Sequence, residues 1–261
     1  MEDILYNFLL QVVFTIGIIV LFGFLIALCN RTFYKNMSRL GLPLCYITGF
    51  IGTPVHELAH ALMCLVFGHK IVEMKLFQIG DSDGTLGYVS HSFNPKNWYH
   101  QIGNFFIGIA PITVISAVLY LLADWLVPGM TSELFSMVKN IERNPEFVTI
   151  ITKLFEMVMV FFSYASADNW WLFLLIGLFL ALHMTLSGAD IKNAFKGLLF
   201  LLAVMLGVNV VMYIFGADLA VLTSECLSIG ILLGGILIMG LFMSLMAVLI
   251  SVAYKLIFDR R

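Results

Sequence analysis

The sequence predicts an all-α polytopic membrane protein of one domain, with about six transmembrane helices and a small β-hairpin between the second and third of them. Hydrophobic side chains make up 61% of the 261 residues and charged ones only 11%, whereas soluble proteins carry about 25% charged residues. Apolar runs long enough to cross a bilayer core of roughly 30 Å also recur along the chain. Composition and the length of these runs together predict the fold class.

The candidates for the six helices are residues 7–29, 44–67, 104–127, 169–186, 198–215 and 227–254. The first run follows the acidic residues Glu2 and Asp3 rather than a basic stretch, so we expect a retained helix and not a cleaved signal peptide. The pattern predicts a multi-pass protein in contact with the lipid bilayer.

The segment 131–167, between the third and fourth runs, mixes charged with apolar side chains and contains the helix breaker Pro145. Its second half, residues 147–167, has two interpretations: an interfacial amphipathic helix, or a seventh span. The cost of placing charged side chains in a membrane favours the interfacial helix.

A β-hairpin is predicted after the second run. Residues 71–79 and 85–93 are rich in Val, Ile, Phe and Tyr, and the turn-forming residues Gly, Asp and Ser fill positions 80–84 between them. No internal repeat or linker divides the sequence, so we expect a single membrane domain over residues 1–261.

Composition disfavours nucleic-acid binding and cysteine-based sites. A net charge of -2 provides no basic field for nucleic acid. The cysteines Cys29, Cys45, Cys64 and Cys226 form no Cys-x-x-Cys pair, so neither a disulfide framework nor a thiolate metal site is indicated.

The chemistry concentrates in the second run, which contains the HExxH motif His56-Glu57-Leu58-Ala59-His60. Residues four apart lie on one face of a helix, so the imidazoles of His56 and His60 can converge on one zinc ion. Glu57 points about 100° away, from where it can act as general base on a water molecule beside the metal. These three are the only Asp, Glu, His, Lys or Arg residues in 44–67, and a charge there costs about 2.5–3.5 kcal/mol on insertion scales. The alternative is a metal-free polar patch at a helix interface.

A hydrolytic zinc site needs three protein ligands and an open position. Asp190 is the predicted third ligand, because small residues interrupt an apolar helix just before it. In the alternative, Asp190 only caps a helix that begins near Ile191. His183 competes as a ligand, as a partner that orients a ligand, or as a histidine bonded inside the bundle. The remaining histidines, His69, His91 and His100, are expected at the surface or at an interface.

These residues resemble the site-2 protease class of intramembrane zinc metalloproteases, in particular its shorter bacterial members. The likeness covers the motif and its continuation through Leu62, the sequence Phe-Gly-His-Lys-Ile-Val at 67–72, the sequence Gly-Ile-Ala-Pro at 108–111, and Asp190, all within residues 52–197. Two departures stand out: Leu-Ser-Gly-Ala-Asp at 186–190 replaces the family's Leu-Asp-Gly-Gly, and Thr113 lies near the place of an Asn that usually follows Gly-Pro.

The resemblance implies a three-helix catalytic core, at approximately 44–197, in which His56, His60 and Asp190 hold zinc and Glu57 is the general base. It further implies that the hairpin, here 71–93, pairs with an unwound strand of a membrane protein or peptide substrate. A multi-pass protein of the bacterial cell membrane is expected on the same grounds.

One other class of function stays open. Transporters of the ZIP type carry similar His/Glu clusters as a transit site for divalent metals, together with a second polar helix, which His183 and Asp190 approximate here. A catalytically inactive scaffold is disfavoured because a structural metal site does not need Glu57. Proteases of the CaaX-prenyl type use a glutamate as third ligand, and no glutamate lies within a clean later span.

Overall fold

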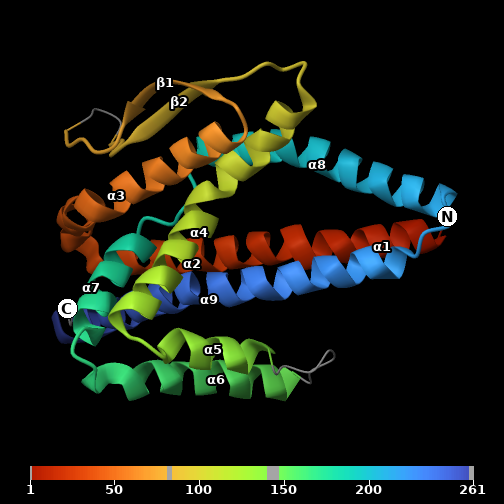
Figure 1. The fold of residues 1–261 in the computed structure, drawn as a ribbon. Helices are drawn as coiled ribbons and strands as arrows, with labels where there is room; N and C mark the ends of the chain where they lie inside the picture. Colours follow the sequence, from red (N-terminus) through yellow and green to blue (C-terminus); the bar gives the residue numbers. More distant parts are fainter. Residues whose placement is uncertain (1, 81–83, 140–146, 259–261) are drawn as a thin grey trace.

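The computed structural model describes residues 2–80, 84–139 and 147–258. It is mostly helical with one small antiparallel sheet, which agrees with the predicted fold class in this coarser form (Figure 1). The elements in chain order are α1 (Glu2–Val12), the π-helical stretch η1 (Val13–Gly17), α2 (Ile18–Met37), the 3-10 turn η2 (Ser38–Leu40), α3 (Gly41–Val66), β1 (Lys70–Lys75), β2 (Tyr88–Ser92), α4 (Trp98–Leu126), α5 (Met130–Lys139), α6 (Phe147–Ser163), the 3-10 turn η3 (Tyr164–Ser166), α7 (Trp170–Ala181), α8 (Gly188–Ile214) and α9 (Leu219–Phe258).

Four helical segments in the described part of the chain are long and apolar enough to cross a membrane: Glu2–Val66, α4, α8 and α9. The first of these holds two predicted runs, because the chain turns at Ser38, whose φ of 48° interrupts the helix between α2 and α3. Such segments are what a bilayer core of roughly 30 Å requires.

The fourth predicted run, 169–186, is helical only in its first part. The helix α7 ends at Ala181, and at 12 residues it is about 18 Å long, too short to cross a membrane alone. A non-helical stretch follows, and Ser187 then caps α8 by accepting a hydrogen bond from the backbone N–H of Asp190. The predicted run therefore contains the whole of α7 and the non-helical stretch that leads to α8.

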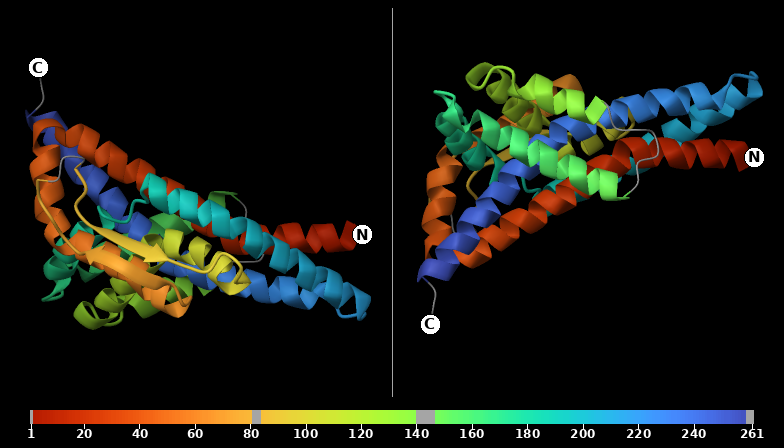
Figure 2. Two further views of the ribbon diagram at one scale, coloured as in Figure 1. Left: turned by 90° about the horizontal axis from the view of Figure 1, so that it is seen from above. Right: turned by 90° about the horizontal axis from the view of Figure 1, so that it is seen from below.

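The helix α4 lies at the centre of the bundle, in contact with α3, α7, α8 and α9. Buried residues lie on all sides of its middle part, over residues 102–112, as expected of a helix surrounded by others. The fully buried Ile115 and Leu119 belong to one core with Phe173 of α7 and Met243 of α9. On the flank of α4, α1 and α2 run side by side with α9 (Figures 1 and 2).

The helices α5 and α6 pack against each other on the side of the bundle away from the hairpin (Figures 1 and 2). Phe161 of α6 contacts Phe242 of α9, with ring centroids 4.2 Å apart, and packs beside Trp170 at the start of α7. The segment 147–167 is thus helical from Phe147 to Ser163 and joined to the core. Whether this helix crosses the bilayer or lies at its interface stays a prediction.

The hairpin is formed by β1 and β2, which pair antiparallel. Both strands contact α3, which connects the hairpin to the bundle. Ile71 opposes His91, Lys75 opposes Tyr88, and a bulge lies between Ile71 and Glu73. The strands are shorter than the predicted 71–79 and 85–93, although the backbone N–H of Gln78 still bonds the carbonyl of Leu86. Part of the predicted turn, 81–83, lies outside the described residues.

The far end of α8 is held by a buried polar network. Gln11 of α1 donates to Asn209 of α8 at 3.0 Å and to Thr223 of α9 at 3.1 Å, and Asn209 donates back to Gln11 at 2.7 Å. Buried polar groups that all find partners favour one arrangement of the helices that carry them. The network thereby positions α8, whose opposite end carries Asp190.

Candidate metal centre

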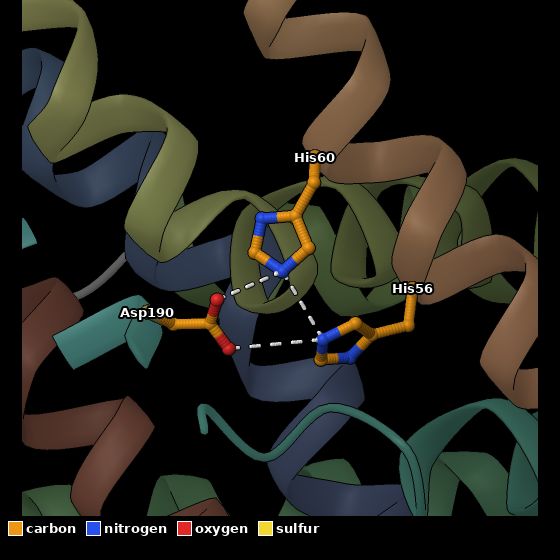
Figure 3. Close-up of side chains that lie close together, drawn as sticks. All are labelled: His56, His60 and Asp190. Carbon is orange, nitrogen blue, oxygen red and sulfur yellow. Dashed lines mark hydrogen bonds and ion pairs between the residues drawn. The ribbon is translucent and has the colours of Figure 1, made fainter. Parts of the chain in front are cut away.

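The centre is built on α3, where His56 and His60 project from one face of the helix one turn apart (Figure 3). Their imidazole Nε2 atoms lie 3.2 Å from each other. His60 is 6% exposed, and Pro54 and Val55 precede the pair within the same continuous helix. The helical spacing therefore brings the two rings together as the motif predicts.

Backbone carbonyls determine which ring nitrogens carry protons. The Nδ1 atom of His56 lies 2.7 Å from the carbonyl oxygen of His183, and the Nδ1 atom of His60 lies 2.7 Å from that of Ile107. A carbonyl oxygen can only accept, so each neutral imidazole has its proton on Nδ1 and a bare lone pair on Nε2. Two lone pairs thus face each other at 3.2 Å, an arrangement that a cation between them would relieve. Metal-bound histidines nearly always make this kind of contact through the other nitrogen.

Asp190 completes the group from the first turn of α8. Its Oδ1 atom lies 3.2 Å from Nε2 of His60, and its Oδ2 atom lies 3.9 Å from Nε2 of His56 (Figure 3). Asp190 also caps α8, because Oδ2 accepts from the backbone N–H of Ser187 at 2.7 Å. The two interpretations of this residue are therefore compatible: one carboxylate caps the helix and faces both histidines.

The geometry fits a metal ion. The donor atoms of His56, His60 and Asp190 lie within 4.8 Å of one another. For metal–ligand distances of about 2.0–2.1 Å, tetrahedral geometry places neighbouring ligand atoms about 3.3–3.4 Å apart, close to the two separations of 3.2 Å found here. Two imidazoles and a carboxylate suit zinc and other divalent transition metals.

Glycines allow α8 to approach α4 closely enough to bring Asp190 into the group. A Cβ atom on Gly108 of α4 would lie 2.5 Å from the carbonyl oxygen of Asp190 and 2.7 Å from the backbone nitrogen of Ala194. A Cβ atom on Gly197, two turns further along α8, would lie 2.1 Å from the backbone nitrogen of Phe105. Small residues at such crossings are typical of packed membrane helices.

His183 orients His56 and does not face the metal group. Its ring nitrogens lie 3.0 Å from the hydroxyl of Thr48 and 3.3 Å from that of Thr53, while its carbonyl accepts the proton of His56. The ring fits against α3 because position 52 is glycine: a Cβ atom there would lie 2.5 Å from His183 Cδ2. The ring of His183 is thus hydrogen-bonded inside the bundle, which is one of its predicted roles, and it is the backbone carbonyl that contacts His56.

A cavity of about 370 Å³ opens beside the group and reaches the hairpin. Glu57 lines it and is 6% exposed; in the described part of the chain its carboxylate has no hydrogen-bond partner. The hairpin covers Glu57 closely, since a Cβ atom on Gly87 would lie 2.9 Å from Glu57 Cγ. The wall opposite the metal group is formed by Thr85, Gly87, Tyr88, Val89 and His91.

Two of the three histidines expected at the surface or at an interface lie at an interface. His69 is 4% exposed, with its Nδ1 atom 3.0 Å from Nδ1 of His91, and His91 lines the cavity. The alternation of side chains along a strand could have predicted the position of His91. Residues 85, 87, 89 and 91 share one face when the hairpin is extended. That face meets the cavity, but the direction it points depends on how the hairpin docks on α3.

Comparison with known proteins assigns no family: no protein-family model, curated protein or solved structure matches the chain. The resemblance to the site-2 protease class therefore rests on the sequence motifs alone. The group of His56, His60 and Asp190 rests on the geometry described above.

Proposed function

We propose that this chain is an intramembrane zinc metalloprotease that hydrolyses peptide bonds in or near transmembrane segments of membrane proteins. His56, His60 and Asp190 would hold the zinc ion, and Glu57 would be the general base. The chain would cross a cell membrane about six times, with the hairpin between the second and third crossings, and α7 with the non-helical stretch after it would form one interrupted crossing.

The observation that carries this proposal is the pair of bare Nε2 atoms, 3.2 Å apart, beside a carboxylate. Hydrogen bonds to the carbonyls of His183 and Ile107 keep both protons on the far sides of the rings. The arrangement favours a cation strongly, and it leaves one face of the group toward the cavity. Three protein ligands with an open position are typical of catalytic rather than structural zinc.

Glu57 is suited to moving protons beside this group. It follows His56 directly in α3, lines the same cavity, and has no hydrogen-bond partner in the described ranges. When bound, zinc supplies Lewis acidity, which polarises a carbonyl group and makes water nucleophilic at neutral pH. The carboxylate of Glu57 would take a proton from that water and later give it to the leaving nitrogen.

The hairpin is suited to holding a substrate strand. In the described part of the chain the sheet has two strands, and β2 pairs with β1 along one edge, so a further strand would add along the other edge. The residues of β2 that line the cavity lie opposite the metal group. A substrate helix conceals its own backbone groups, and strand addition at this edge would hold an unwound segment extended across the cavity.

The test measures zinc and cleavage together in detergent-purified protein. Zinc per chain is determined by elemental mass spectrometry for the wild type, His56→Ala, Asp190→Ala and Glu57→Gln, and each is incubated with a synthetic transmembrane peptide. We expect about one zinc in the wild type, loss of zinc in the first two variants, and retained zinc without cleavage in Glu57→Gln.

Asp218→Ala is the matched control for Asp190→Ala. Asp218 also stands at a helix start, where its Oδ1 accepts from the backbone N–H of Ala220 at 2.9 Å, but it is remote from the metal group in sequence and fold. This variant should keep zinc and cleavage. Absence of zinc in the wild type, or unchanged cleavage by Glu57→Gln, would reject the protease; zinc uptake into liposomes would then support the ZIP-like transporter.

A further inference from the structure

A second pair of histidines, His69 and His91, is not used by the proposed chemistry, although His91 lines the cavity. His69, between α3 and β1, places Nδ1 3.0 Å from Nδ1 of His91 on β2. Its Nε2 lies 2.9 Å from the carbonyl oxygen of His100. The ring of His69 is buried and stacks on Phe93, with centroids 4.9 Å apart and planes at 16°. The ring of His69 is therefore held by a stacked neighbour and by contacts at both nitrogens.

The contacts determine where each proton lies. The carbonyl of His100 can only accept, so Nε2 of His69 carries a proton. Burial lowers the pKa of His69, which keeps the ring neutral and leaves its Nδ1 bare. Burial and the neighbouring His69 and His60 also lower the pKa of His91 to about 4. The short contact between the rings therefore has His91 Nδ1–H as donor and His69 Nδ1 as acceptor.

It follows that Nε2 of His91 is a hydrogen-bond acceptor. This nitrogen lies on the opposite side of the ring from Nδ1, and no described residue bonds to it. His91 lines the cavity together with His56, Glu57, His60 and Asp190, and none of these four residues makes a hydrogen bond to it. The natural donor for such an acceptor is a group of a bound molecule.

We propose that His91 is a further catalytic residue, whose Nε2 accepts a hydrogen bond from the N–H of the peptide bond being cleaved. The proposal rests on the proposed function. In hydrolysis, a water oxygen forms a bond to the carbonyl carbon, the carbon–nitrogen bond breaks, and one water proton passes through Glu57 to the nitrogen. The products are a carboxylic acid and an amine. By holding the original N–H, His91 directs the lone pair of the nitrogen toward the proton that it receives.

The test uses three substitutions that differ in which ring nitrogen they imitate. His91→Ala removes both nitrogens, and His91→Asn retains a donor near Nδ1 without an atom at the place of Nε2. His91→Gln places an amide oxygen near Nε2. We expect kcat to fall on the order of 10- to 100-fold in the Ala and Asn variants and to recover in part in His91→Gln, with zinc per chain unchanged. Ser90→Ala, at the exposed neighbouring position of β2, is the matched control and should cleave as the wild type does.

An ester analogue of the synthetic transmembrane peptide distinguishes the role of His91 from a general loss of structure. Its scissile bond has oxygen in place of N–H, so His91 has nothing to hold. We expect the Ala and Asn variants to cleave the ester at nearly the wild-type rate while cleaving the amide slowly. Equal losses on both substrates, or loss of zinc on substitution, would overturn the proposal and leave the protease intact.

A measurement without turnover gives an independent answer. Nitrogen-15 spectra of selectively labelled histidine report which ring nitrogen carries the proton in the wild-type protein. We expect Nδ1–H for His91; Nε2–H would overturn the proposal whatever the variants do. Failure of the protease itself has a different signature, because then the wild type cleaves neither substrate or Glu57→Gln cleaves both.

Discussion

The molecule contains two histidine pairs with nearly the same separation and opposite chemistry. The Nε2 atoms of His56 and His60 are 3.2 Å apart, and the Nδ1 atoms of His69 and His91 are 3.0 Å apart. In the first pair both rings donate their proton to a backbone carbonyl, so two lone pairs meet. In the second pair only His69 donates to a backbone carbonyl, so His91 can donate an ordinary N–H···N hydrogen bond to His69. The contacts on the far side of each ring, and not the distance between rings, distinguish a cation site from a hydrogen bond.

The largest effect expected is that of metal removal, because it acts on the first pair alone. A ligand that binds the folded state at 1,000 times its Kd stabilises it by about 4 kcal/mol, so a chelator should lower the Tm on the order of 10 °C. His69→Ala should show the same chelator shift, from a lower starting Tm. In Asp190→Ala the chelator should leave the Tm unchanged, as followed by thermal unfolding. A chelator shift in Asp190→Ala as large as that of the wild type would disprove the site.

Gly108→Ala should weaken metal binding by moving the first turn of α8. The new Cβ would lie 2.5 Å from the carbonyl oxygen of Asp190, and backbone atoms cannot rotate away. We expect the affinity to fall about 10- to 100-fold, as measured by competition with a chromophoric chelator.

The matched control is Gly207→Ala, in the exposed middle of α8, where no described atom lies within 4 Å of the new Cβ. This variant should keep the affinity of the wild type. An affinity that is unchanged in Gly108→Ala would mean that the α4–α8 crossing does not position Asp190.

His183→Ala tests the support of the first pair, since it removes a ring but keeps the carbonyl that accepts from His56. Thr48 and Thr53 lose a partner, so the free energy of unfolding should fall by about 1–3 kcal/mol. Zinc per chain, measured by elemental mass spectrometry, should stay at the wild-type value. Loss of zinc in His183→Ala would instead indicate that the ring of His183 binds the metal.

The smallest effect is expected for Ser187→Ala, which removes the hydroxyl that caps α8. Asp190 keeps its bond from the backbone N–H of Ser187, so the carboxylate should stay near the histidines. We expect a loss of about 1 kcal/mol in unfolding free energy and unchanged zinc. Ser224→Ala, which removes an exposed hydroxyl bonded within α9, should change neither quantity.

Local pattern was enough to predict the apolar helices, the hairpin and the HExxH pair. Hydrophobic runs determine which segments can be helices in a bilayer, and the spacing of four residues places His56 and His60 on one face whatever surrounds them. Asp190 was a weaker prediction, since an acid behind small residues suits a cap as well as a ligand. The structure makes the two compatible, because one carboxylate accepts from the backbone N–H of Ser187 and also lies 3.2 Å from Nε2 of His60.

The sequence by itself determined a membrane-type helical protein with two histidines and a glutamate in position for metal chemistry. Tertiary structure alone decided the break of the 169–186 run at Ala181, the rotation of the His183 ring toward Thr48, and the place of His91 at the cavity. The physical reason is that proton positions depend on carbonyls 47 to 127 residues away along the chain. Those carbonyls come into reach only when α4 and the stretch after α7 pack against α3, and no local pattern records that packing.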